Sequence, residues 1–125
     1  MGYIIDVSQS IWRIVFSETL TSADLRQLAK EAAEIETNTP VVASRLVDLR
    51  ELCTITVGFS EVGDLAAARR SLTLPNSIRS ALLVSNPVQL GYARMFQTLL
   101  EHPQIEVRVF SDEKDALVWL SGGSR

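Results

Sequence analysis

The chain has 125 residues, of which 46% are hydrophobic and 22% are charged, a globular composition that excludes a mainly disordered protein. A net charge of −3 provides no basic field for nucleic acid, so no nucleic-acid partner is expected. With one histidine and one cysteine, the chain lacks the ligand set of a zinc or iron–sulfur site, and neither a metal nor another cofactor is expected.

The compartment is predicted from what the sequence lacks. A single cysteine, Cys53, cannot form an internal disulfide, which fits a reducing environment. No apolar run is long enough to span a bilayer, and the first residues do not form a secretory signal. We therefore expect a cytoplasmic protein with no membrane span, consisting of one domain over residues 1–125 with a flexible tail at 121–125.

The chain begins with two β-rich segments, residues 3–7 and 11–16, joined by a short polar stretch that predicts a hairpin. In the second segment Trp12, Ile14 and Phe16 share one face and Arg13 lies on the other. Such a hairpin is expected at the edge of a sheet, where Arg13 can reach water.

The next segment predicts a helix that begins after Thr21 and ends at residues 38–40. Thr21 is a helix-capping residue, and Asp24 suits the positive end of the helix dipole. The apolar residues fall on one stripe: Leu25, Leu28, Ala29, Ala32 and Ile35.

Residues 41–49 (VVASRLVDL) form an apolar run of strand length, and residues 50–60 after it are predicted to be a loop. Runs rich in Val and Leu are typical of a strand buried on both faces, as in a parallel sheet covered by helices. We expect this strand to be central to the fold.

Helices and strands then alternate to the end of the chain. Ser60 is predicted to cap a helix at 61–72, Asn86 a helix at 87–101, and Ser111 a last helix that ends at Gly122. Strands are predicted between them, at residues 79–85 and 105–110, the latter an outer strand because it alternates apolar and charged residues.

This order predicts an α/β fold with a mainly parallel, mixed β-sheet of about five strands and four helices. Strands alternating with helices pair in parallel through right-handed crossovers. The first strand is expected to run antiparallel, since a hairpin connects it to the second.

Three stretches resemble the SpoIIAA-like, STAS-related family and its uncharacterised bacterial members. They are LVDLREL at 46–52, SALLVSNPVQLGYARMFQ at 80–97 and VRVFSDEKDALVWL at 107–120. The resemblance implies a small cytosolic SpoIIAA-like (STAS-like) domain. It also implies a non-enzymatic binding or regulatory role through protein contacts, because the family includes anti-sigma factor antagonists.

The sequence departs from that family at its regulatory serine. Anti-sigma factor antagonists carry a phosphorylatable serine in a turn at the start of the helix after the strand that ends Asp-Leu. Counting from Asp48, that turn falls at residues 56–59, where Gly58 offers no hydroxyl. Thr56 and Ser60 are nearby hydroxyls without the motif, so no phosphoserine switch is expected at this turn.

The alternative function is binding of a small anionic or lipid-like ligand, with or without catalysis, at the carboxyl ends of the parallel strands, where open α/β sheets bind ligands. The candidate ligand-binding residues are Asp48, Arg50, Ser60, Asn86 and Ser111. The plainer interpretation is that the two serines and Asn86 only cap helices and that Asp48 accepts hydrogen bonds from loop amides. No catalytic residue is predicted, because the chain lacks a Ser–His–Asp set, a Walker loop and GxGxxG.

The helix at 87–101 is the candidate partner surface. Its apolar residues extend beyond the stripe that one sheet face requires. The candidate interface residues are Tyr92, Arg94, Met95 and Leu99, which would contact a protein partner or a second copy in a homodimer. Burial of the helix between two neighbours would explain the same pattern.

Overall fold

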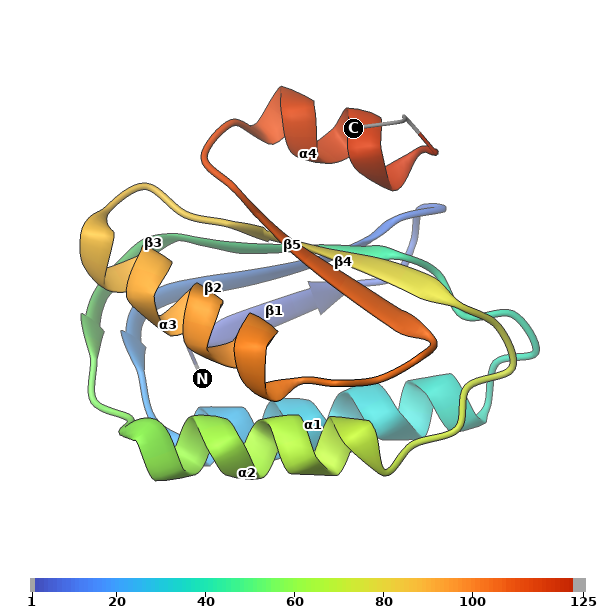
Figure 1. Cartoon of the computed structure of the whole chain (residues 1–125), viewed down its shortest axis with the longest axis horizontal. Coiled ribbons are helices and arrows are strands. Elements are labelled where there is room, and N and C mark those ends of the chain that lie inside the picture. The colour runs from blue at the N-terminus through green and yellow to red at the C-terminus, as the bar shows by residue number, and fades with distance from the viewer. Residues whose placement is uncertain (1, 123–125) are drawn as a thin grey trace.

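The computed structural model describes residues 2–122, and this part of the chain forms five strands and four helices (Figure 1). The strands are β1 (Tyr3–Asp6), β2 (Trp12–Leu20), β3 (Arg45–Ile55), β4 (Ile78–Leu83) and β5 (Ile105–Phe110). The helices are α1 (Ser22–Thr37), α2 (Phe59–Arg70), α3 (Pro87–Leu99) and α4 (Glu113–Leu120). The predicted α/β class is confirmed.

The strands form one mixed sheet in the order β1-β2-β3-β4-β5. β1 pairs antiparallel with β2, and each later neighbour pairs in parallel. The predicted hairpin and the predicted outer strand therefore lie at the two edges of the sheet, and the strand that we expected to be central lies in the middle.

The helices cover the two faces of the sheet unequally. α1, α2 and α3 lie on one face and α4 lies alone on the other (Figure 1). Trp12, Ile14 and Phe16 point toward the three helices and are buried, as their alternation predicts. On the α4 face, Trp119 packs with strand residues such as Leu83 in a separate cluster.

Local sequence signals set the beginnings of two helices. The Thr21 hydroxyl accepts a hydrogen bond from the Asp24 amide at 3.2 Å, and the Asp24 carboxylate accepts one from the Thr21 amide at 3.3 Å. Asn86 caps α3 by accepting a hydrogen bond from the Gln89 amide at 2.9 Å. Both predicted caps are confirmed. The sequence could predict them because a cap depends on neighbours within one turn.

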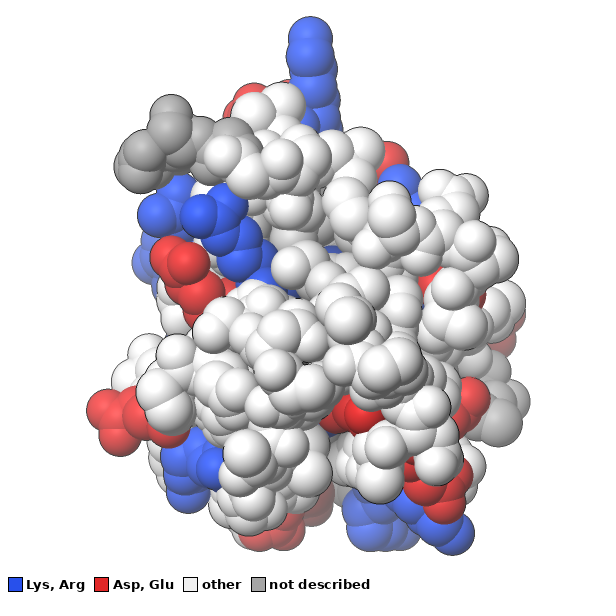
Figure 2. All heavy atoms as spheres, turned by 90° about the vertical axis from the view of Figure 1, so that its right-hand side faces the viewer, with Lys and Arg blue, Asp and Glu red and all other residues white. Residues whose placement is uncertain are grey.

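Two side-chain amides tie the loops at the edge where the parallel strands begin. Asn76 accepts from the Val42 amide and donates to its carbonyl oxygen, both at 2.8 Å. Gln104 bonds Leu74 in the same reciprocal way, at 2.9 and 2.7 Å. Figure 2 looks onto this edge and shows a largely uncharged centre with charged side chains mainly around the rim.

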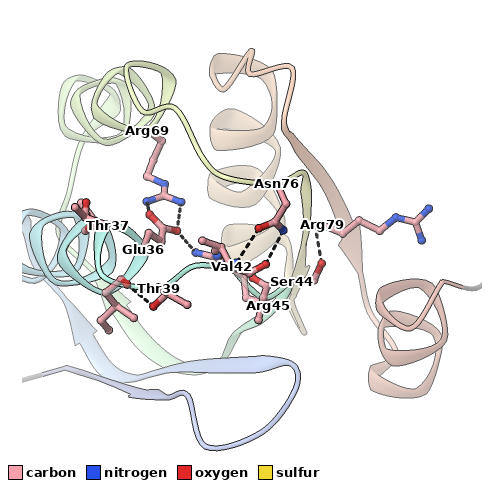
Figure 3. Close-up of polar contacts among 12 residues, drawn as sticks. Glu36, Thr37, Thr39, Val42, Ser44, Arg45, Arg69, Asn76 and Arg79 are labelled. Carbon is pink, nitrogen blue, oxygen red and sulfur yellow. Dashed lines mark hydrogen bonds and ion pairs between the residues drawn. The ribbon is translucent and has the colours of Figure 1, made fainter.

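The bounds of the central strand were predicted wrongly. β3 begins at Arg45, since the backbone of Val42 bonds Asn76 instead of a neighbouring strand (Figure 3). It continues to Ile55 through most of the predicted loop, because β2 extends to Leu20 and pairs with it. Two register shifts accompany this pairing, and Glu18 beside one of them adopts a φ of 64°.

The end of the described chain closes α4. The Ser121 amide donates to the Leu117 carbonyl oxygen at 3.0 Å, and Gly122 has a φ of 96°, which favours glycine. The remainder of the predicted tail, residues 123–125, lies outside the described residues. No helix between residues 2 and 122 is long and apolar enough to cross a membrane.

Candidate functional site

Asp48 and Arg50 lie together on the α4 side of β3. The Asp48 carboxylate accepts hydrogen bonds from the Arg50 amide and Nε, both at 3.0 Å, and from Arg50 Nη2 at 2.9 Å. Burial opposes ionisation of Asp48, but the hydrogen bonds from Arg50 outweigh it and hold the pKa of Asp48 below its usual value. Asp48 is therefore held as an anion inside the sheet, and the one backbone amide that it binds belongs to β3 and not to a loop.

Glu113 extends this pair into a four-residue network. Its carboxylate accepts hydrogen bonds from Arg50 Nη2 at 2.8 Å and from Arg13 Nη2 at 2.9 Å. The bond from Arg13 is the main cause of the lowered pKa of Glu113. Two cations meet two anions here, so the network is neutral, and an added anion would have to displace Glu113 from Arg50.

The other predicted ligand-binding residues do not join this network. Asn86 caps α3. Ser60 is not a cap. Helix α2 begins at Phe59 with Gly58 as its capping position, and Ser60 is exposed within the helix. Ser111 is also not a cap, because Asp112 accepts the hydrogen bonds from the amides of Lys114 and Asp115 at 2.8 and 3.3 Å.

The predicted interface residues on α3 differ in their surroundings. Tyr92, Met95 and Leu99 are half-buried and pack against the core, while Arg94 is exposed. The Tyr92 hydroxyl donates to the Val57 carbonyl oxygen at 2.6 Å. Intramolecular packing thus accounts for much of the apolar width of α3, which was the alternative explanation, and an interface through these residues stays a prediction.

Gln89 closes the carboxyl edge of the sheet between β3 and β4. Its side chain is 1% exposed; Oε1 accepts from the Ser85 amide at 2.8 Å, and Nε2 donates to the Leu52 carbonyl oxygen at 3.2 Å. This amide thus links the end of β3 with the segment that follows β4. The sequence carried no signal for it, because a glutamine early in a helix is ordinarily a solvent-facing residue.

The same edge carries two exposed apolar side chains. Phe59, the first residue of α2, is 65% exposed, and Val88 near the start of α3 is 62% exposed. The two helices begin on the same side of the molecule (Figure 1), and the bond from Tyr92 to Val57 ties them together. Two apolar side chains therefore project from this edge.

A buried ion triad lies at the opposite end of the sheet (Figure 3). Glu36 accepts hydrogen bonds from Arg69 Nη1 and Nη2 at 2.8 and 2.7 Å and from Arg45 Nη1 at 2.6 Å. The three residues are between 3% and 8% exposed. Burial disfavours the Glu36 anion, but the two arginines outweigh this effect and lower the pKa of Glu36. Sequence reasoning missed this triad, although Arg45 within an apolar run and Arg69 on the apolar face of a helix were visible signals.

The triad borders a cavity of about 130 Å³ between the sheet and the three helices that cover it. Leucine, isoleucine, valine, alanine and aromatic side chains form most of the wall, together with Arg45, Arg69 and Ser80. This cavity lies beside the buried face of the sheet, away from the predicted ligand-binding residues Asp48 and Arg50.

The geometry can be compared with that of known proteins. No family model and no curated protein matches the sequence. Among solved structures, the chain is similar to an uncharacterised DUF3478-family protein with a SpoIIAA-like fold from Shewanella loihica PV-4, with a TM-score of 0.60, 20% identity and coverage of 94% of this chain and 91% of that chain. It is also similar to an anti-sigma factor antagonist from Mycobacterium paratuberculosis, with a TM-score of 0.62, 12% identity and coverage of 95% and 92%. At these identities the likeness concerns the fold, and the chain has the SpoIIAA-like fold that its sequence motifs predicted.

Proposed function

We propose that the protein is a non-enzymatic binding module that contacts another protein through the carboxyl edge of its parallel strands. The observation that carries this proposal is that two apolar side chains, Phe59 and Val88, are exposed at an edge where Gln89 is itself buried and hydrogen-bonded. Exposed apolar side chains of this kind suit the core of a protein contact.

The kind of partner is suggested by the fold. The mycobacterial structural neighbour is an anti-sigma factor antagonist. A regulatory partner protein that covers Phe59 and Val88 with its own apolar side chains would fit the same fold in this chain. Gly58 lies directly before Phe59 and carries no hydroxyl, so binding would not be controlled by a phosphoserine at that position.

Ligand binding is the second candidate function. It is favoured by the apolar cavity beside Arg45 and Arg69, and not by the residues at the carboxyl edge. The cavity is inside the molecule, whereas Phe59 and Val88 are on its surface, so the two functions do not exclude each other.

Site-specific photocrosslinking in cells of the native host tests the proposed contact. Benzoylphenylalanine would replace Phe59, Val88 or Val118; Val118 is 53% exposed on α4, on the other face of the sheet, and is the control. We expect Phe59 and Val88 to crosslink to the same protein, and Val118 not to do so. With the crosslinker at position 88, Phe59→Asp should abolish capture of the partner, whereas Val118→Asp should not.

Crosslinks to a second copy of the chain would identify the partner as the protein itself. An equal yield from all three positions, or no crosslink from Phe59 and Val88, would contradict the proposed surface. Because all three side chains are exposed, the substitutions leave the core intact, and loss of folding would not explain a loss of binding.

A further inference from the structure

The cavity between the sheet and α1–α3 has room for a small apolar group. Its volume is about 130 Å³, and its wall includes Ile14, Val47 and Leu82 from the sheet and Leu28 and Phe96 from the helices. An apolar protein cavity of about 150 Å³ stays dry and accepts benzene. The space therefore suits an apolar body the size of one six-membered ring.

One end of the cavity carries an unbalanced charge. Arg45 and Arg69 both line the wall, and both bind the single carboxylate of Glu36. Burial lowers the pKa of Arg45 to about 10, which still leaves it protonated at neutral pH. Two guanidinium groups against one carboxylate leave the triad with a net charge of about +1 in a place where an uncompensated ion is costly.

Arg45 also has a donor that nothing in the described chain accepts. Its Nη1 binds Glu36, its Nη2 binds the Ala43 carbonyl oxygen at 2.9 Å, and its guanidinium stacks 4.5 Å from the centre of the Trp12 ring. Arg45 Nε is the one buried side-chain nitrogen or oxygen atom between residues 2 and 122 without a hydrogen-bond partner. A buried donor left in this state costs stability, so the site lacks an acceptor.

A route from the surface adjoins the cavity. A second hollow, of about 210 Å³, lies between α1 and α2 and shares three wall residues with the cavity: Leu25, Ala29 and Leu65. Ala29 and Leu65 are only half-buried. The hollow and the cavity are therefore separated only by side chains that line both of them.

We propose that the cavity binds a compact amphipathic monocarboxylate, with its apolar body among the aliphatic and aromatic side chains and its carboxylate beside the guanidinium groups of Arg45 and Arg69. A monoanion would bring the triad to neutrality. A neutral apolar molecule would leave the positive charge in place, and a dianion would reverse its sign. The ion triad (Figure 3) lies at the end of the sheet opposite to Phe59 and Val88, and neither of these two residues lines the cavity, so either proposal can fail while the other stands.

Benzoate and its neutral analogue benzamide test the site on the purified chain. The readout is the pair of indole N–H signals in a proton–nitrogen correlation spectrum, because Trp12 stacks on Arg45 while Trp119 lies on the α4 side of the sheet. We expect benzoate to shift the Trp12 signal saturably and to leave Trp119 unchanged. Benzoate should bind at least about tenfold more tightly than benzamide, the selectivity expected from a charged hydrogen bond.

Two pairs of variants test separately the charge of Arg45 and the volume of the cavity. Arg45→Met should remove the preference for benzoate over benzamide, whereas Arg94→Met on the exposed surface of α3 should retain it. Ala32→Leu fills the cavity and should weaken binding of both probes, whereas Ala67→Leu on the exposed face of α2 should leave both unchanged.

Equal affinity of the wild-type protein for the two probes would overturn the proposal, since the cavity would then recognise apolar bulk alone. Absence of saturable binding of either probe would also overturn it and would leave the triad a purely structural feature. If Arg45→Met does not fold, the wild-type comparison and the Ala32→Leu variant still decide the matter.

Discussion

The side-chain amide of Gln89 donates to the carbonyl oxygen of Leu52 at 3.2 Å, and this bond joins the beginning of α3 to the far end of β3. The same amide accepts a hydrogen bond from the Ser85 backbone at 2.8 Å. Gln89 thus satisfies backbone groups of two neighbouring segments in a place that water does not reach. Gln89 therefore links β3 with the segment that follows β4 at the carboxyl edge of the sheet.

Gln89→Leu should destabilise the protein. It removes the partners of the Ser85 amide and the Leu52 carbonyl oxygen, and a buried group left unpaired costs about 1–3 kcal/mol. Urea denaturation measures the change. The control is Thr98→Leu, because Thr98 lies exposed on the same helix and the substitution should change the free energy of unfolding by less than about 0.5 kcal/mol. Equal midpoints for the two variants would contradict the role of Gln89.

Glu36→Gln should lower the free energy of unfolding by more than Gln89→Leu does. It removes the only carboxylate of the triad and leaves Arg45 and Arg69 buried side by side, and loss of one partner from a buried ion pair costs about 3–5 kcal/mol. Glu34→Gln, on the exposed side of the same helix, provides the control. A small difference between the two variants in a denaturation experiment would show that the arginines find other compensation.

The stability of the protein should fall in acid. Glu36, Asp48 and Glu113 each have a pKa below the usual value in the folded state, so the folded chain binds fewer protons than the unfolded chain near pH 4. The stabilisation that they supply is present above their usual pKa values and is lost as pH falls through the lowered ones. Denaturation between pH 7 and pH 3 should show a decline that begins near about pH 5. The free energy of unfolding should decline less steeply with falling pH in Glu36→Gln than in the wild type. An identical slope would show that Glu36 does not contribute to the decline.

The two halves of the Arg50 network should differ in strength. Asp48 is 5% exposed, and Asp48→Ala should lower the free energy of unfolding by about 1–3 kcal/mol because the Arg50 amide loses its acceptor. The Arg50 and Glu113 side chains are 37% and 35% exposed, so a double-mutant cycle between them should give about 0.2–1 kcal/mol, falling further in high salt. If the coupling energy between Arg50 and Glu113 exceeded the loss of stability in Asp48→Ala, the exposed half of the network would be the stronger one, contrary to this prediction.

Gly58→Ser should be tolerated. Gly58 has a φ of −103°, which any residue adopts, and an added Cβ would meet only the flexible end of the Glu61 side chain, at 3.1 Å. Serine is a better helix cap than glycine, so the stability should change by no more than a few tenths of a kcal/mol. Thermal denaturation checks this expectation, and a large loss would show that the backbone requires glycine here.

The wild-type chain should carry no regulatory phosphate at this turn. The hydroxyls nearest to Gly58 in the sequence belong to Thr56 and Ser60, and the Thr56 hydroxyl already donates to the Leu20 carbonyl oxygen at 3.1 Å. Intact-mass measurement of protein from the native host checks for the modification. Stoichiometric phosphate on Thr56 or Ser60 would contradict the prediction.

The sequence by itself determined the elements whose signals are local. Thr21 and Asn86 cap their helices through amides less than one turn away, and the alternation of Trp12, Ile14 and Phe16 places these side chains on one face of β2. Short-range steric and hydrogen-bonding preferences suffice for such features. The element order then predicted the mixed parallel sheet, because crossovers have one favoured hand.

Only the tertiary structure decided the bounds of β3, the contacts of Gln89 at the carboxyl edge and the composition of the Glu36 triad. The backbone of Val42 could have joined a strand, but Asn76, 34 residues away, binds it instead. Glu36 meets Arg69 across 33 residues, and Gln89 meets Leu52 across 37. Each of these polar groups had many possible partners along the chain, and its choice was fixed by which groups the packed sheet and helices bring together out of reach of water.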